Sequence, residues 1–439
     1  MEKTNYMEST LKLDWTRPDS PVDMDALETQ IVEAGKRLEH LSSAQIVSVF
    51  DDLSKSLLTR ENPLLHSYPS AGLPFLARMC QAEGFSLEVA DALGGLDCLD
   101  DFIPRKYVAG YEKRAYPKGI VGHWIAGNVP TLALISLLSS LMTKNANIVR
   151  LPSAADNFLP CLLRHLHGLG EAHSVVASAV TVVRYDFNDT VTADRLSLMA
   201  DVRIIWGGDE SSSKVKALPC KLNCQDLIFP DRTSFAVIGK SGLAPEKISG
   251  TTRLLAHDIS VFEQKACASP HTVFLATDSD LELEFFCTNL FEALAGMLKI
   301  IPKTPPTPLE LSAILNLRSQ YDMFYDAWYP DEVHFSILSD SEIKIGPPIG
   351  NRTIFVRKLP SCEELAQILP GTIQSVGVAA EGFEFEELTQ SLGRAGVHRF
   401  TPLGGMTHFS LPWDGMFIPQ SLVRWVTRST HGSECGVES

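Results

Sequence analysis

The sequence offers one cysteine in a setting suited to covalent chemistry. Nine cysteines occur among 439 residues, and eight of them stand in helix-like, strand-like or tail contexts. Cys267 instead stands in the small-residue turn Ala-Cys-Ala-Ser-Pro, between a helix-like run and the apolar run HTVFLA. Small neighbours leave room for a substrate carbonyl, and backbone N–H groups in such a turn can stabilise a thiolate and an oxyanion. The alternative is a packed core cysteine, which is the commoner role.

Three turns that follow apolar runs supply candidates for cofactor binding. They lie in GHWIAGNVPT, NIVRLPS and IIWGGDESSSKVKAL. A turn that joins a strand to a helix binds phosphates and dinucleotides, because free N–H groups and the helix dipole face the ligand. The ten candidates are Trp124, Ala126, Gly127, Arg150, Pro152, Ser153, Gly207, Gly208, Asp209 and Ser212. The usual Gly-x-Gly-x-x-Gly fingerprint is absent, because Gly122 and Gly127 are spaced wrongly for it.

Each turn also has a plainer interpretation. Asn128 either presents a polar amide at the end of the sheet or, with Pro130, caps the following helix. Arg150 either binds a ribose 2′-phosphate or pyrophosphate or is exposed to solvent. Gly207 and Gly208 either open a helix toward a ligand or precede an ordinary N-cap.

Other catalytic signatures are missing. Cys220 and Cys224 are four residues apart, but no second Cys or His pair stands near enough to complete a zinc site, so we expect no metal. The sequence contains neither a Gly-x-Ser-x-Gly elbow nor a Walker loop, which argues against the usual hydrolases and P-loop proteins.

The elements that must position these residues follow from the apolar pattern. Residues 22–105 show helical spacing, and from residue 118 onward short apolar strands alternate with helices. This alternation predicts an α/β fold with a mostly parallel sheet. We expect a cofactor-binding domain over 1–255, with a helical part at 1–105 and a parallel α/β part at 106–255. A catalytic thiol domain over 256–410 and a C-terminal element with a loose tail over 411–439 should follow.

The composition limits which classes of partner and which cellular compartment we expect. The net charge is 38 − 53 = −15, and no cluster of Lys and Arg stands out, which disfavours nucleic acid and anionic membranes as partners. The odd, sparse cysteines favour a reducing compartment. The longest apolar run, Thr131–Met142, is shorter than the ~20 residues of a membrane helix. With no secretory signal at Met1–Trp15, we expect a cytoplasmic protein without a membrane span.

The order of the motifs carries more information than any one of them. The series HWIAGNVP, NANIVRLPS, IIWGGDESSSKV, FEQKACASP and PLGG…PWDG resembles the acyl-CoA reductase family of bacterial luminescence systems, the fatty-acid reductase component. That family is a branch of the aldehyde dehydrogenase superfamily, and the resemblance covers most of the chain. It implies an aldehyde-dehydrogenase-like fold, with a Rossmann-like cofactor domain, an α/β catalytic domain and a small oligomerisation element.

The resemblance also implies roles for individual residues. Cys267 matches the acyl-accepting nucleophile, Asn128 the amide that helps to form the oxyanion hole, and Arg150 the basic residue near the adenosine ribose. Gly207, Gly208 and the serines after them match the turn beneath the pyrophosphate. The glutamate that activates water in oxidising aldehyde dehydrogenases would fall near IFPDRTSFAVI, where no Glu stands. Their second glutamate, on the nicotinamide ribose, would fall near residues 350–353 and is also missing.

We therefore expect NADPH-dependent reduction of an acyl thioester, from acyl-CoA or a carrier, to the aldehyde through a cysteine acyl-enzyme. Arg150 makes NADPH the first choice, with NADH as the alternative. His257 and His271 are candidates for the proton donor. Expected partners are an acyl-transferring or acyl-activating protein and further copies of the chain. Two alternatives stay open: an oxidising or acylating aldehyde dehydrogenase, and a non-reducing acyl-transfer partner.

Overall fold

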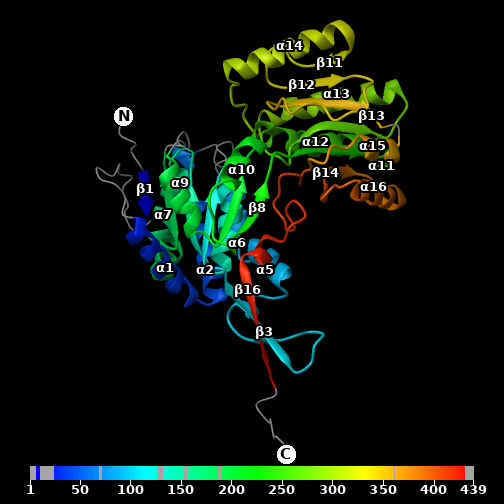
Figure 1. The fold of residues 1–439 in the computed structure, drawn as a ribbon. Helices are drawn as coiled ribbons and strands as arrows, with labels where there is room; N and C mark the ends of the chain where they lie inside the picture. Colours follow the sequence, from blue (N-terminus) through cyan, green and yellow to red (C-terminus); the bar gives the residue numbers. More distant parts are fainter. Residues whose placement is uncertain are drawn as a thin grey trace, which may run out of the picture. The chain divides into compact units, whose positions relative to one another are not determined.

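The chain folds into two compact units (Figure 1). The computed structural model describes residues 6–9, 24–68, 72–125, 132–152, 156–185, 189–359 and 361–430. Unit 1 comprises Met1–Pro230 and Phe409–Ser439, and unit 2 comprises Asp231–His408. The boundary thus falls after Pro230 instead of near residue 255. Residues 409–430 join unit 1 and do not form a separate C-terminal element.

Unit 1 is built on a six-stranded sheet in the order β1-β6-β5-β4-β7-β8. All its strands run parallel except β1, which is antiparallel to β6. Runs such as IVGHW and VRIIW are buried throughout, which is typical of parallel strands covered on both faces. The strands are β1 (Tyr6–Ser9), β4 (Ile120–Trp124), β5 (Ala146–Arg150), β6 (Val180–Arg184), β7 (Val202–Trp206) and β8 (Gln225–Phe229).

Helices of unit 1 begin and end where the sequence supplies caps and glycines. Ser42 and Gln45 form a capping box at the start of α2. Gly168 and Gly170 lie between α7 and α8. The helices are α1 (Met24–Glu39), α2 (Ser43–Leu57), α3 (Pro63–Ser67), α4 (Leu73–Cys80), α5 (Phe85–Leu93), the short 3₁₀ turn η1 (Asp97–Leu99), α6 (Leu132–Met142), α7 (Phe158–His167), α8 (Glu171–Ser178), α9 (Thr190–Met199), α10 (Asp209–Lys216) and α17 (Ile418–Ser421).

A small antiparallel sheet completes unit 1. Its order is β16-β3-β2, formed by β16 (Val423–Ser429), β3 (Tyr111–Pro117) and β2 (Ile103–Pro104). Tyr111–Pro117, expected within the parallel part, therefore belongs to this antiparallel sheet, because β3 pairs along its length with a strand from the end of the chain.

Unit 2 contains a seven-stranded sheet in the order β11-β12-β13-β10-β9-β14-β15. All neighbours run parallel except β11 and β12. The run SFAVIG falls within the cofactor-binding domain that we expected over 1–255. It instead forms β9 of unit 2, because it pairs with β10 and β14, which come later in the chain. The strands are β9 (Thr233–Ile238), β10 (Pro270–Leu275), β11 (Asp326–Trp328), β12 (Ser336–Ser339), β13 (Thr353–Lys358), β14 (Ile373–Ala379) and β15 (Arg399–Pro402).

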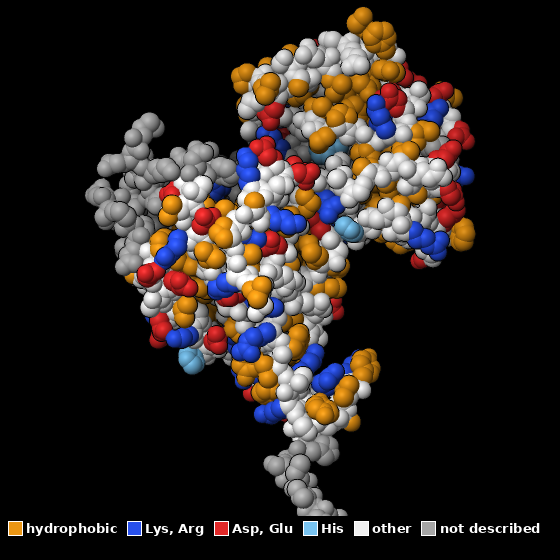
Figure 2. All heavy atoms as spheres, in the orientation of Figure 1, with side chains coloured by type: hydrophobic (Ala, Val, Ile, Leu, Met, Phe, Trp, Pro, Cys, Tyr) orange, Lys and Arg blue, Asp and Glu red, His pale blue; other side chains and the backbone are white. Residues whose placement is uncertain are grey.

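Helices pack on both sides of this sheet, and the buried residues form two core clusters, one that includes Phe286 and one that includes Phe274. A capping box between Thr307 and Glu310 starts α14. Figure 2 shows hydrophobic side chains gathered on unit 2 where α14 runs. The helical segments are α11 (Lys240–Leu243), α12 (Ile248–Ser260), the 3₁₀ turn η2 (Val261–Gln264), α13 (Asp280–Met297), α14 (Pro308–Phe324), α15 (Cys362–Ile368) and α16 (Gly382–Arg394). Among the residues described, none of the helices has the length and apolar character to cross a membrane.

Candidate active site

A pocket of about 540 Å³ lies in unit 1 at the carboxyl ends of β4, β5, β6 and β7. In open α/β sheets this edge is where ligands bind. The described residues that line it are Trp124, Ile125, Arg150, Pro152, Tyr185, Thr190, Ala193, Ile205, Trp206, Gly207, Gly208, Ser211, Lys214, Val215, Ala217 and Leu218. This set contains two cations and no carboxylate, so it favours an anionic ligand with an apolar part.

Five of the predicted cofactor residues meet in this pocket: Trp124, Arg150, Pro152, Gly207 and Gly208. Asp209 and Ser212 are not in its lining. Asp209 is the first residue of α10, and the buried Ser212 hydroxyl donates to the Gly207 carbonyl at 2.8 Å. The remaining predicted residues Ala126, Gly127, Asn128 and Ser153 lie outside the described part of the chain.

Arg150 is placed by an aromatic neighbour that the sequence analysis missed. The Arg150 guanidinium carbon lies 5.4 Å from the centre of the Tyr185 ring, within cation–π range. The Trp124 indole N–H donates to the Tyr185 hydroxyl at 3.3 Å. Burial raises the pKa of Tyr185, so its phenol stays neutral. Tyr185 directly follows β6 at the same sheet edge as Arg150, which is the signal that points to it.

Lys214 is the second cation of the pocket, one turn into α10. Its ammonium donates to Glu210 at 2.6 Å on the exposed side of the helix. Gly208 is the N-cap residue of α10, so the first N–H groups of the helix open beside the pocket. This terminus is a favourable place for a phosphate.

A buried arginine on β7 forms hydrogen bonds to the end of α10. Arg203 is 1% exposed and forms a bidentate pair with Asp226, with both distances 2.7 Å. It also donates to the carbonyls of Val215 and Leu218 at 3.2 and 3.1 Å. Both residues line the pocket, so Arg203 fixes one wall of it.

A polar network beneath the pocket holds Trp206. His123 contacts Ser136 through Nδ1 at 2.9 Å and Asn147 through Nε2 at 3.0 Å. The Trp206 indole N–H donates to the same Ser136 hydroxyl at 3.2 Å. The network thereby ties β4, β5 and α6 to the pocket wall at the end of β7.

Cys267 lies in unit 2, half-buried, in the loop between η2 and β10. The loop precedes β10, so it lies at the amino ends of the parallel strands. The Cys267 carbonyl accepts a hydrogen bond from the Ser234 hydroxyl at 2.7 Å, and that hydroxyl accepts one from the Ser375 N–H at 3.2 Å. The backbone at Cys267 is thus anchored to β9 and β14.

Several other cysteines are unsuited to attack a carbonyl. Burial raises the pKa of Cys80 to about 12 and that of Cys98 to about 11, and it raises the pKa of Cys287 further. Only the thiolate is a strong nucleophile, and these groups stay protonated at neutral pH. Among the described residues, no three His, Cys, Asp or Glu side chains are grouped as a metal site would require.

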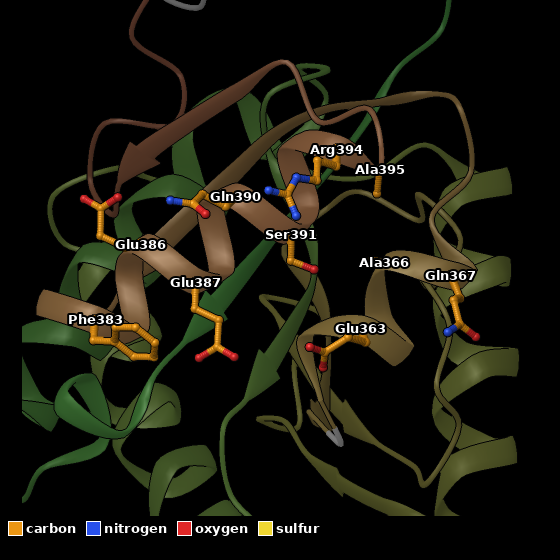
Figure 3. A pocket seen from close by; sticks show the side chains of 10 residues that line it. All are labelled: Glu363, Ala366, Gln367, Phe383, Glu386, Glu387, Gln390, Ser391, Arg394 and Ala395. Carbon is orange, nitrogen blue, oxygen red and sulfur yellow. The ribbon is translucent and has the colours of Figure 1, made fainter.

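Unit 2 also carries a groove of about 570 Å³ between α15 and α16 (Figure 3). The side chains of Glu363, Glu387 and Arg394 are among those lining it. None of the residues predicted for catalysis or cofactor binding belongs to this groove, and we assign it no role in the reaction.

The two histidines suggested as proton donors differ in environment. His271 lies in β10 and is 5% exposed, and burial lowers its pKa to about 4. It is therefore neutral at pH 7 and poorly suited to give up a proton. His257, in α12, has a side chain 37% exposed, with Nδ1 3.5 Å from the Asp258 carboxylate. It is the more exposed of the two, and its role as proton donor stays a prediction.

Two buried histidines should make the protein sensitive to moderate acid. Burial lowers the pKa of both His123 and His271 from 6.5 to about 4. Below pH 6.5 the unfolded chain binds protons at these rings, whereas the folded chain does so only near pH 4. We expect the free energy of unfolding to fall in this window by about 1.4 kcal/mol per pH unit and per histidine.

Urea unfolding of the native chain and of His271→Asn, at about pH 7 and about pH 5, tests this expectation. The variant should lose roughly 2 kcal/mol less than the native chain between the two conditions. An equal loss in both proteins would show that His271 does not remain neutral in the folded state.

Comparison with known proteins identifies the family. The profile of the acyl-CoA reductase (LuxC) family matches residues 39–425. The long-chain acyl-protein thioester reductase of Aliivibrio fischeri is 27% identical over 345 residues, which are 76% of this chain and 68% of that protein. The protein of the same name from Photorhabdus luminescens is 25% identical over 361 residues, 80% of this chain and 71% of its own length.

Solved structures show the same fold. The NAD-dependent benzaldehyde dehydrogenase from Corynebacterium glutamicum superposes with a TM-score of 0.63 at 12% identity, covering 98% of this chain and 99% of that one. The predicted aldehyde-dehydrogenase-like fold is therefore confirmed. Because the family profile matches most of the chain, the protein belongs to the acyl-CoA reductase (LuxC) family, whose members are aldehyde-forming oxidoreductases.

Proposed function

We propose that this chain reduces an acyl thioester to the aldehyde, with NADPH as the hydride donor and Cys267 as the acyl-accepting nucleophile. Family membership supports the reaction class. The observation that carries the choice of cofactor is the pocket of unit 1, whose described lining holds Arg150 and Lys214 and no carboxylate. A carboxylate there would favour the free ribose hydroxyls of NADH, whereas a cation favours the 2′-phosphate of NADPH.

The residues of the pocket fit such a dinucleotide. The N–H groups at the start of α10, beside Gly207 and Gly208, suit the pyrophosphate. Apolar side chains such as Ile205 and Val215 suit an adenine ring. When bound, NADPH would supply the hydride for the reduction.

Cys267 carries the covalent chemistry in this proposal. Its thiolate forms a bond to the acyl carbon, and the carbon–sulfur bond to the donor thiol breaks, which leaves the acyl group on Cys267. The Cys267 N–H and the Asn128 amide are the proposed oxyanion donors, each worth about 3–4 kcal/mol. After reduction, the bond to Cys267 breaks and the aldehyde leaves. Overall, one thioester, one hydride and one proton give one aldehyde and one thiol.

The segment around β9 supports reduction over hydrolysis. Residues 228–238, which run from β8 into β9, contain no glutamate. Without that glutamate to activate water, the acyl group on Cys267 persists until it is reduced. This favours aldehyde formation over an oxidising dehydrogenase that releases an acid.

The test is NADPH oxidation with acyl-CoAs of graded chain length and with a protein-bound acyl thioester, combined with trapping of the aldehyde. We expect one aldehyde for each NADPH oxidised. A donor preference then separates acyl-CoA from the acyl-protein thioesters named for the relatives. If NADPH is present and the labelled acyl group passes to a second acceptor with no NADPH oxidation and no aldehyde, the proposal is contradicted and an acyl-transfer role is supported. Assays with aldehyde, thiol and NADP⁺ measure the acylating direction.

A further inference from the structure

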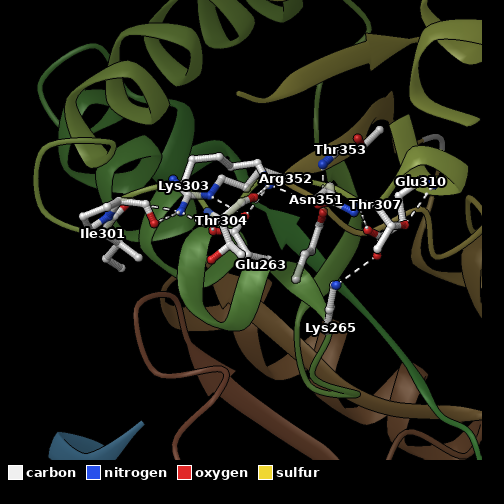
Figure 4. Close-up of polar contacts among 12 residues, drawn as sticks. Glu263, Lys265, Ile301, Lys303, Thr304, Thr307, Glu310, Asn351, Arg352 and Thr353 are labelled. Atoms are coloured by element: carbon white, nitrogen blue, oxygen red, sulfur yellow. Dashed lines mark hydrogen bonds and ion pairs between the residues drawn. The ribbon is translucent and has the colours of Figure 1, made fainter. Parts of the chain in front are cut away.

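A buried ion cluster lies immediately before the loop that carries Cys267 (Figure 4). The Glu263 carboxylate, in η2, accepts four hydrogen bonds. Arg352 donates two, through Nε at 3.1 Å and Nη2 at 2.8 Å. The Lys303 ammonium donates one at 2.7 Å and the Thr304 N–H another at 3.0 Å. The cluster therefore joins three segments: η2, the turn after α13 and the start of β13.

The cluster is shielded from water. The side chains of Glu263, Lys303 and Arg352 are 11%, 7% and 0% exposed. Burial alone would raise the pKa of Glu263, but hydrogen bonds from Arg352 and Lys303 lower it overall. Glu263 is thus an anion held by two cations, and removing its charge would leave both of them buried without their partner.

The backbone beside Glu263 is held in an uncommon conformation. Phe262, Glu263 and Gln264 have φ of 53°, 53° and 62°, in the left-handed region that residues with side chains rarely adopt. Three such residues in succession persist only where the surroundings fix them. One fixing contact is the hydrogen bond from the Asn351 N–H to the Glu263 carbonyl, at 2.8 Å.

Gln264 bridges the two ends of the loop through its side chain. It is 1% exposed, and its Oε1 accepts from the Thr353 N–H at 2.8 Å. Its Nε2 donates to the Pro270 carbonyl at 2.6 Å. Gln264 and Pro270 flank residues 265–269, so this one side chain closes the loop in which Cys267 is the middle residue.

From this arrangement we infer that Glu263 is a positioning residue for Cys267. Its ion pairs with Arg352 and Lys303 hold η2 in the left-handed conformation from which Gln264 closes the loop, and the loop presents the Cys267 thiol and N–H. Glu263 touches neither Cys267 nor a reacting group in this scheme. The inference rests on the proposed function only in taking Cys267 as the nucleophile.

The central test measures the alkylation of Cys267 by iodoacetamide over a range of pH, read for each cysteine by peptide mass spectrometry. In Glu263→Gln, which keeps the side-chain shape, we expect the Cys267 rate at neutral pH to fall at least about tenfold, because misplacement of a reacting group by a distant change is costly. The exposed Cys220 of unit 1 serves as an internal reference and should keep its rate. An unchanged or faster rate at Cys267 would overturn the inference.

Asp340→Asn provides a matched control. Asp340 forms a buried bidentate pair with Arg357 of β13, at 2.8 and 2.7 Å, with side chains 3% and 2% exposed. This variant removes a buried charge from the same sheet without touching η2. It should lower thermal stability and leave the Cys267 rate as in the native chain. An equal loss of Cys267 reactivity in both variants would mean that Glu263 acts only through general stability.

Lys303→Met keeps the inference testable if Glu263→Gln does not fold. It removes one cation from the rim of the cluster and keeps the pair between Glu263 and Arg352. We expect a fall of a few-fold in the same direction, and no change would overturn the inference. Because alkylation needs neither NADPH nor a thioester, it reports on the loop even if the proposed reduction proves wrong.

Discussion

Alanine at position 267 should abolish aldehyde formation and leave binding of NADPH intact. The substitution removes the proposed nucleophile, so no acyl group can be held for reduction. We expect turnover to fall by at least about 10³-fold, as when other covalent nucleophiles are removed. NADPH oxidation with aldehyde trapping measures turnover, and fluorescence of the bound cofactor measures binding. Incubation with a labelled acyl thioester and no NADPH should label the native chain and not the variant.

A second cysteine supplies the control for this result. Cys220 is exposed in unit 1, between α10 and β8, and Cys220→Ala makes the same chemical change away from the turn of Cys267. This variant should keep both turnover and labelling. If Cys267→Ala retained full aldehyde formation, the nucleophile would have to be another group. If it lost turnover but kept the label, Cys267 would act after acyl transfer.

Sequence patterns predicted the elements of unit 1 well where apolar runs ended in clear turns. The runs that form β4, β5 and β7 are bounded by Gly, Asn or Pro, and each matches its strand closely. An apolar run bounded by turns does not reveal which sheet the strand joins. The run of β9 is as apolar as those of unit 1, and only its pairing with β10 and β14 places it in unit 2.

The start of α14 shows a local signal that could have been used. Prolines follow α13 at positions 302, 305, 306 and 308, and Thr307, Pro308 and Glu310 form the capping pattern that starts α14. Proline is well tolerated at the first helical position, because its missing N–H would have no partner there. A proline-rich stretch can therefore precede a helix as readily as follow one.

Site residues were predictable where their own sequence neighbours indicate a chemical role. Turn residues and the small-residue setting of Cys267 are visible in short segments. Tyr185 and Lys214 act through neighbours in space. The position of Tyr185 after a strand indicates the sheet edge but not its contact with Arg150, and a lysine in a helix has no distinctive local pattern. Glu263 is harder still, since Arg352 and Lys303 lie far along the chain and only the fold brings their charges to it.

The second large effect concerns the choice of cofactor. Arg150→Ala should raise the KM for NADPH by about 10- to 100-fold, because a hydrogen-bonded contact to a charged group contributes about 1.5–3 kcal/mol. The KM for NADH should change little, since NADH has no 2′-phosphate for Arg150 to bind. The ratio of kcat/KM for the two cofactors, measured with one acyl thioester, should therefore shift toward NADH.

Arg195→Ala is the control for Arg150, because Arg195 lies in α9 of the same unit, is not among the lining residues and pairs with Asp25. It should leave the ratio of kcat/KM for the two cofactors unchanged.

Tyr185→Leu tests how much the aromatic neighbour of Arg150 contributes. The variant keeps the Arg150 cation and removes the ring 5.4 Å from it, so it should weaken NADPH selectivity less than Arg150→Ala does. If Arg150→Ala leaves the ratio unchanged, Lys214, the other cation of the pocket, becomes the group to test. The case for NADPH over NADH would then no longer rest on Arg150.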